Sequence, residues 1–108
     1  LVTATFATVY NTWYDFRKLN LKSDNVVQNF LKICNGLRSY GAGLDYCLID
    51  DGWFKTSSVY QTNTDLFPNG LSEVSDAITP YGAHLGLWLA YSSLQSDNNY
   101  SVQYTVAY

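Results

Sequence analysis

The chain has 108 residues, of which 47% are hydrophobic and 14% are charged. That composition fits one small globular domain and excludes a disordered chain. The net charge is −3, and the six basic residues are scattered, so a nucleic-acid partner is not expected. No apolar run is long enough for a membrane helix, and we expect no membrane partner either.

The first strand-helix unit opens the chain. β-branched and aromatic residues predict a strand over residues 6–11. A helix is predicted over residues 24–39, because Ser23 and Asp24 are typical helix-start residues and apolar residues then recur every three or four positions. Gly41 follows this helix, where a left-handed helix end favours glycine.

A second unit repeats the pattern. An apolar strand is predicted over residues 46–50, followed by a long polar loop over residues 55–65. The apolar periodicity then predicts a helix over residues 71–81, which Gly82 ends. A third apolar strand is predicted over residues 85–90. The order is therefore β-α-β-α-β.

The segments Tyr40-Gly41-Ala42 and Tyr81-Gly82-Ala83 match, and each leads from a helix into an apolar strand. Such a repeat is typical of consecutive β-α units in a parallel sheet, so the fold class is α/β. A closed barrel needs eight strands and about 250 residues, which leaves part of a barrel or a small open sheet. Residues 92–108 are an uncertain tail, in which residues 101–108 alternate in places as a short strand does.

Two adjacent aspartates, Asp50 and Asp51, follow the second predicted strand. Their charges repel each other and neither is a good strand former, so a ligand or solvent must face them. Ligands bind at the carboxyl ends of parallel strands. Carboxylates accept hydrogen bonds from sugar hydroxyls, and the ring of Trp53 suits the C–H face of a sugar. The alternative is a solvated turn, because Asp and Gly are ordinary turn residues.

The two cysteines are interpreted as buried free thiols, Cys34 on the apolar face of the first helix and Cys47 in the second strand. They approach each other if that helix packs on that strand, but the sequence does not establish a disulfide. Residues 99–101 form a single glycosylation sequon, Asn99-Tyr100-Ser101, which is weak evidence for secretion.

Three motifs in order resemble the N-terminal part of the barrel of melibiase-type, α-galactosidase-like enzymes, in glycoside hydrolase clan D, families 27 and 36. Together they extend over residues 6–90. They are Asn11-Thr12-Trp13, similar to the first-strand N-[ST]-W signature; Asp50-Asp51-Gly52-Trp53, the second-strand DDGW motif; and Phe67-Pro68-Asn69-Gly70-Leu71 with residues 82–88, similar to FP.GL…G…G[LI]W.

The resemblance implies a (β/α)8 TIM barrel, of which residues 1–108 carry the first three strands, and hydrolysis of the O-glycosidic bonds of α-galactosides. It also implies that Asp50 and Asp51 bind the hydroxyls of a galactose-like sugar. Trp13 and Trp88 would line the same pocket, with Trp53 beside it. The alternative for Trp13 and Trp88 is a purely structural place in the core.

Asp15 is interpreted as a helix-cap or loop acid, and His84, at the start of the third strand, as a structural histidine. In the family the nucleophile and the acid/base lie on the fourth and sixth strands. The sequence offers no counterpart of the nucleophile strand after Ala90, because Asp97, which lies in this region, stands in a polar segment and not at the end of an apolar strand. We therefore expect no catalytic residue within this chain, and no turnover by the chain alone. No metal and no other cofactor is expected.

Three hypotheses remain open. The first is part of an α-galactosidase-like hydrolase that holds sugar-binding residues and pairs with the remainder of its barrel. The second is a non-catalytic carbohydrate-binding module that self-associates to cover its open sheet edges. The third is an unrelated small α/β domain with coincidental motifs.

Overall fold

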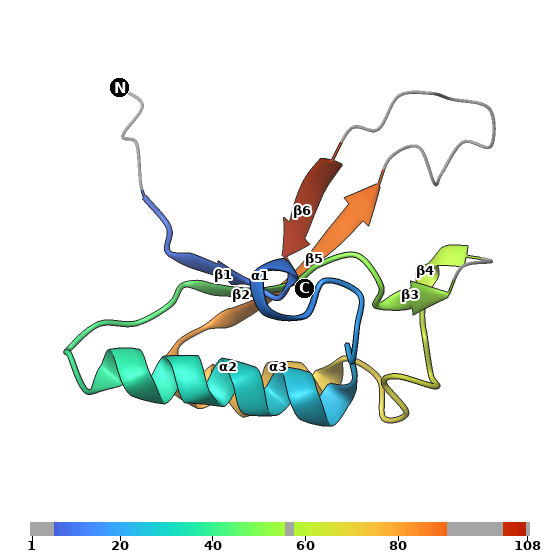
Figure 1. Cartoon of the computed structure of the whole chain (residues 1–108). Helices are drawn as coiled ribbons and strands as arrows, with labels where there is room; N and C mark the ends of the chain where they lie inside the picture. The colour runs from blue at the N-terminus through green and yellow to red at the C-terminus, as the bar shows by residue number, and fades with distance from the viewer. Residues whose placement is uncertain (1–5, 56–57, 91–102, 108) are drawn as a thin grey trace, which may run out of the picture.

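A four-stranded sheet is the centre of the fold (Figure 1). Its strand order is β1-β2-β5-β6, and β1, β2 and β5 are parallel, whereas β6 is antiparallel to β5. The strands are β1 (Val9–Asn11), β2 (Tyr46–Ile49), β5 (His84–Ala90) and β6 (Gln103–Ala107). The structure is a computed structural model, and it describes residues 6–55, 58–90 and 103–107.

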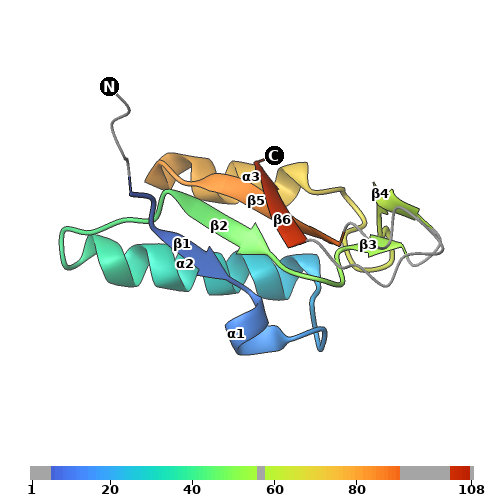
Figure 2. The ribbon, with the colours of Figure 1, turned by 90° about the horizontal axis from the view of Figure 1, so that it is seen from above.

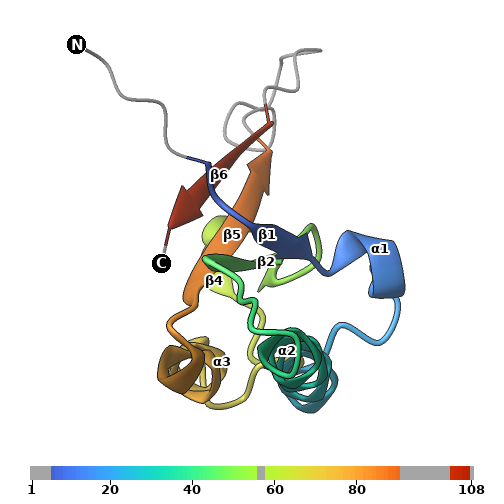
Figure 3. The same ribbon diagram turned by 90° about the vertical axis from the view of Figure 1, so that its left-hand side faces the viewer.

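Two helices, α2 (Ser23–Arg38) and α3 (Ser72–Ile78), cover the same face of this sheet (Figure 3). A short 3-10 helix, η1 (Thr79–Tyr81), continues α3. Seen from above, β1, β2 and β5 point in the same direction over the two helices (Figure 2). The predicted β-α-β-α-β order and the parallel pairing of its second and third strands are confirmed.

The first strand is shorter than predicted, because β1 begins at Val9 rather than at residue 6. Its partner β2 begins only at Tyr46, so residues 6–8 have no neighbouring strand. The amide of Thr8 instead donates to the carboxylate of Asp45, with an N–O distance of 2.8 Å.

The core lies between the helices and the sheet. Its fully buried side chains come from α2, α3, β2, β5 and the segment before α3; they include Val26, Phe30, Ile49, Phe67, Val74, Ile78 and Leu85. Each large apolar side chain buried in this way contributes about 1.5–3 kcal/mol to stability. The ring of Tyr10 meets that of Phe30 edge to face, with the ring centroids 5.9 Å apart, and so joins β1 to α2.

Helix α2 begins at Ser23, one residue before the predicted start at Asp24, and the side chain of Ser23 does not cap it. The hydroxyl of Ser23 donates to Oε2 of Glu73 on α3, 3.1 Å away, and thereby connects the two helices. Both predicted glycine ends are confirmed. Gly41 has φ 71° and donates to the carbonyl of Arg38, and Gly82 has φ 74° and donates to that of Thr79.

Two parts of the described chain differ from the prediction. The segment expected to be a polar loop instead contains β4 (Ser58–Thr62), which pairs antiparallel with β3 (Phe54–Lys55). The sequence of β4, SVYQT, includes Val, Tyr and Thr, which favour strands, but the polar residues around them indicated a loop. A short helix, α1 (Trp13–Phe16), follows β1 and was not predicted. The strand suspected in residues 101–108 is present as β6, but it runs antiparallel to β5.

The structure therefore shows a mixed α/β fold with a three-stranded parallel core. It does not show a barrel, since β6 lies along the edge of β5 at which a fourth parallel strand would pair. The sequon and Asp97 lie outside the described residues. Within residues 6–55, 58–90 and 103–107, the helices are all too short or too polar to cross a membrane.

Candidate functional site at the carboxyl ends of β1, β2 and β5

The two aspartates lie where β2 ends, beside the end of β1. The amide of Thr12 donates to the carbonyl of Leu48, and the Thr12 hydroxyl accepts from the amide of Asp50, both at 3.0 Å. Thr12 is fully buried. Its hydroxyl thus takes the place of the next backbone acceptor and fixes the chain at the point where it leaves the sheet.

Asp50 is held by internal hydrogen bonds. Its Oδ2 accepts from Nδ2 of Asn11 and its Oδ1 accepts from the amide of Asp51, both at 2.7 Å. Asn11 is itself oriented, because its Oδ1 accepts from the amide of Trp13 at 2.7 Å. Hydrogen bonds to a charged group contribute about 1.5–3 kcal/mol each, which offsets the burial of a carboxylate that is only 9% exposed.

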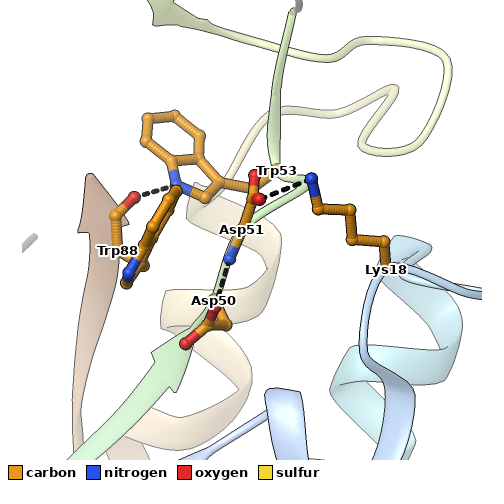
Figure 4. Close-up of polar contacts among 5 residues, drawn as sticks. All are labelled: Lys18, Asp50, Asp51, Trp53 and Trp88. Carbon is orange, nitrogen blue, oxygen red and sulfur yellow. Dashed lines mark hydrogen bonds and ion pairs between the residues drawn. The ribbon is translucent and has the colours of Figure 1, made fainter. Parts of the chain in front are cut away.

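Asp51 points away from Asp50 and toward Lys18 (Figure 4). Nζ of Lys18 lies 2.5 Å from Oδ2 of Asp51. The lysine side chain is 59% exposed and the aspartate side chain 22%, so solvent screens this pair and it adds at most about 1 kcal/mol to stability. The two carboxylates therefore diverge and are not placed to flank one bond.

The turn after the aspartates requires glycine. Gly52 has φ 119°, a conformation that other residues rarely adopt, and a Cβ atom at this position would lie 3.1 Å from Cδ2 of Leu21. The turn directs Trp53 back against the sheet, where the indole is 5% exposed.

Three aromatic rings gather beside the aspartates. Nε1 of Trp53 donates to the carbonyl of Trp88 at 2.7 Å (Figure 4). The ring of Phe54 lies edge-on to Trp53, with centroids 5.3 Å apart, and nearly parallel to Trp88, at 6.4 Å and 8°. Because Trp53 is buried and Trp88 is half-buried, Trp88 offers more of its surface to a ligand.

Asp50 and Trp88 belong to the sheet face that the helices do not cover. Ile49 is paired with Leu87 in the β2–β5 register, so the next residues along, Asp50 and Trp88, are level with each other. Leu85 and Leu87 face the buried core, and side chains alternate along a strand, so Trp88 projects to the opposite side.

Trp13 is linked to this site through its backbone rather than its ring. Its amide joins the chain of hydrogen bonds that runs through Asn11 to Asp50. The guanidinium of Arg17 lies 5.3 Å from the centroid of its half-buried ring. The structure therefore brings Asp50, Asp51, Trp53 and Trp88 together and places Trp13 at their margin.

Four residues at this edge were not predicted from the sequence as site residues. They are Asn11, Thr12, Lys18 and Phe54. Asn11 ends the first strand and Thr12 follows it directly, and that position was the available signal. The sequence carried no signal for Lys18, because the position of its ammonium group depends on the turn after α1.

Asp15 and His84 lie outside the site. The Asp15 carboxylate accepts hydrogen bonds from the hydroxyl of Tyr10 and from Nδ2 of Asn29, which lower the pKa of Asp15. Burial, followed by the hydrogen bond to Asp15, raises the pKa of Tyr10. His84 is exposed at the start of β5, with its ring centroid 5.8 Å from that of Tyr46. Asp15 lies within the first turn of α1, so the expectation of a cap or loop acid is wrong.

No metal centre is evident in the part of the chain that the structure describes, where no three His, Cys, Asp or Glu side chains are grouped suitably. A surface cavity of about 370 Å³ lies at the start of α2, lined in part by Lys22, Asp24, Asp65 and Glu73. It shares no lining residue with the site.

The sequence matches no protein-family model and no curated protein. The likeness to α-galactosidase-like enzymes therefore rests on the three motifs alone. What the geometry adds is that two of these motifs, those of Asn11 and Asp50, meet in one hydrogen bond.

Proposed function

We propose that this chain forms the sugar-binding wall of an α-galactosidase-like glycoside hydrolase, and that the carboxyl edge of β1, β2 and β5 binds a galactose-like sugar. The observation that carries the proposal is the fixed, nearly buried carboxylate of Asp50 on the same sheet face as the half-buried ring of Trp88. A sugar needs this combination, because its hydroxyls donate hydrogen bonds and its C–H groups pack on an aromatic face.

The hydrogen bonds of Asp50 favour binding in a second way. A carboxylate that is already oriented loses little conformational freedom when a ligand arrives. Each carboxylate oxygen has two lone pairs, so Asp50 keeps acceptor capacity beyond the bonds from Asn11 and the Asp51 amide. Asp51, which is partly exposed, contributes a second acceptor at the margin.

Binding, and not bond cleavage, is the role proposed for these carboxylates. A retaining glycosidase places its two catalytic carboxyl groups about 5 Å apart on opposite sides of the scissile bond. Asp50 and Asp51 instead point apart, and Lys18 already pairs with Asp51 (Figure 4). Catalysis in the proposed enzyme therefore belongs to carboxylates other than these two.

We further propose that the three parallel strands are consecutive strands of a (β/α)8 barrel. Support comes from the position of α2 and α3 on one sheet face and of Asp50 and Trp88 on the other, since a barrel has helices outside and ligand groups at the strand ends. The proposal requires a parallel strand in the place that β6 takes beside β5.

A second candidate is a non-catalytic, self-associating carbohydrate-binding module. The observation in its favour is that β1 is an edge strand in the described part of the sheet, with Val9 53% exposed. Unpaired edges favour pairing with another chain. Size-exclusion chromatography at micromolar concentration separates the two candidates, because only the second predicts a dimer or larger assembly.

The binding proposal is tested by titrating the chain with galactose and following tryptophan fluorescence. We expect saturation in the millimolar range, equivalent to about 4 kcal/mol, because the hydrogen bonds replace bonds to water on an open wall. Asp51→Ala should weaken it, because the change removes the second acceptor at the margin of the site. The matched control is Asp76→Ala, which removes an exposed carboxylate from α3. No saturable change, or an equal loss in both variants, would contradict the proposal.

A further inference from the structure

The two cysteines face each other across the interface between α2 and β2. Cys34 is 3% exposed and Cys47 is fully buried, both belong to the same buried core cluster, and both are free thiols in the structure. The backbone explains why they meet. Cys34 follows Phe30 by about one helical turn, the ring of Phe30 packs on Tyr10, and Tyr10 is paired with Cys47 in the β1–β2 register.

This pair is separate from the proposed sugar site. The side chain of Cys47 belongs to the core beneath the helices, together with Ile49, whereas Asp50 begins the edge above. Nothing in sugar binding uses a thiol. Within the described residues no further metal-ligating side chain is grouped with the two thiols, so a metal site does not account for them either.

We propose that Cys34 and Cys47 form an intramolecular disulfide that fastens α2 to β2. A disulfide requires two Cβ atoms that point toward each other across a short distance. Cys34 points from α2 and Cys47 from β2 into the same buried core cluster, so the two side chains approach each other from facing elements. The bond would close a short loop of chain that contains the end of α2, Gly41 and the start of β2. It would thereby anchor the strand that leads into Asp50.

The oxidant is a low-molecular-weight disulfide such as glutathione disulfide. One cysteine thiolate attacks it, forms a mixed disulfide and releases one glutathione thiolate. The second cysteine thiolate then attacks the cysteine sulfur of the mixed disulfide, forms the Cys34–Cys47 bond and releases the second glutathione thiolate. The two cysteine protons are taken up by the two glutathione thiolates, so one disulfide is reduced and one is formed.

Burial of the two thiols in the core determines at which stage of folding this exchange happens. Burial, followed by the charge and the hydrogen bond of Cys34, raises the pKa of Cys47 to about 12, so this residue is almost entirely a neutral thiol near pH 7. Since only thiolates exchange, the bond forms during folding, before α2 closes over β2. Once made, it is shielded from reductants by the same burial.

The test is to refold the reduced chain in glutathione buffers of graded redox poise, then quench with acid and block free thiols. Trypsin cuts after Lys32, Arg38 and Lys55, so the expected product is residues 33–38 linked to residues 39–55 in a monomer. The equilibrium constant for forming the bond is measured in native buffer and in concentrated urea. We expect it to be at least about tenfold larger in native buffer, equivalent to about 1.4 kcal/mol.

The ratio of the two equilibrium constants is decisive, because any chain with two cysteines forms some intramolecular disulfide even when it is unfolded. By linkage, a larger constant in native buffer means that the fold favours the bond. A ratio below tenfold, or both thiols found blocked in folded chain at the most oxidising poise, would overturn the proposal. As controls, Cys34→Ala and Cys47→Ala should melt at the same temperature in oxidising and reducing buffer, whereas the unmodified chain should melt higher in oxidising buffer.

Discussion

Nδ2 of Asn11 donates a 2.7 Å hydrogen bond to Oδ2 of Asp50, and this contact joins the carboxyl ends of β1 and β2. Backbone pairing alone would align the two strands, but it would not orient the carboxylate. The side-chain bond does so, because Asn11 is fixed in turn by the amide of Trp13. Backbone pairing therefore aligns the strands, and the side chains of Asn11 and Asp50 fix the geometry of the site.

Removing either partner should reveal this dependence. Asn11→Ala leaves a nearly buried carboxylate without one donor, and we expect a loss of about 1–3 kcal/mol in the free energy of unfolding. Asp50→Ala should be similarly destabilising. The double variant should lose less than the sum, since the two changes remove one shared interaction. Urea denaturation of the four chains measures the coupling, and strict additivity would mean that the bond contributes nothing.

Gly52→Ala should destabilise the turn at the site. A side chain at φ 119° is strained, and the new Cβ would press on Leu21, which is 1% exposed. The expected loss is about 1–3 kcal/mol. Gly36→Ala is the matched control, because Gly36 lies inside α2 with no atom within 4 Å of an added Cβ. That variant should gain up to about 1 kcal/mol. Equal thermal shifts in both variants would contradict the argument.

The contact between Tyr10 and Asp15 should make stability depend on pH in the acid range. The hydrogen bond from Tyr10 lowers the pKa of Asp15 in the folded state. Its stabilising effect is therefore fully present above the unfolded value of about 3.9 and is lost as the pH falls through the lower folded value.

Tyr10→Phe should consequently reduce the urea midpoint more at pH 7 than at pH 2. Tyr81→Phe provides the control, because the hydroxyl of Tyr81 donates to the neutral amide oxygen of Asn35 at 2.6 Å. Its effect should be the same at both pH values. A Tyr10→Phe effect that does not change between pH 7 and pH 2 would show that the carboxylate charge is irrelevant to this contact.

The chain alone should not release the aryl group from an aryl α-galactoside. Asp50 and Asp51 diverge, and neither can act as a nucleophile opposite an acid/base partner on the same bond. The measurement is absorbance of the freed phenol at several chain concentrations. Release in proportion to chain concentration would mean that a nucleophile was overlooked, and Asp65→Asn and Asp97→Asn would be the first variants to assay.

The sequence by itself determined the parallel core and the location of the edge. Periodic apolar residues and the two glycine-ended helices suffice for this, because apolar spacing decides which helix face is buried and Gly41 and Gly82 adopt positive φ. It also indicated that Asp50 and Asp51 follow a strand. These are local properties, readable from neighbours in the chain.

Only the tertiary structure decided which groups meet at that edge. Lys18 reaches Asp51 from the turn after α1, and the buried Trp53 donates to the carbonyl of Trp88 on another strand. The hydroxyl of Ser23, typical of a cap in sequence, bonds instead to Glu73 on a neighbouring helix. Such contacts depend on how separate segments pack, and the free energy of packing outweighs the local preference of a single side chain.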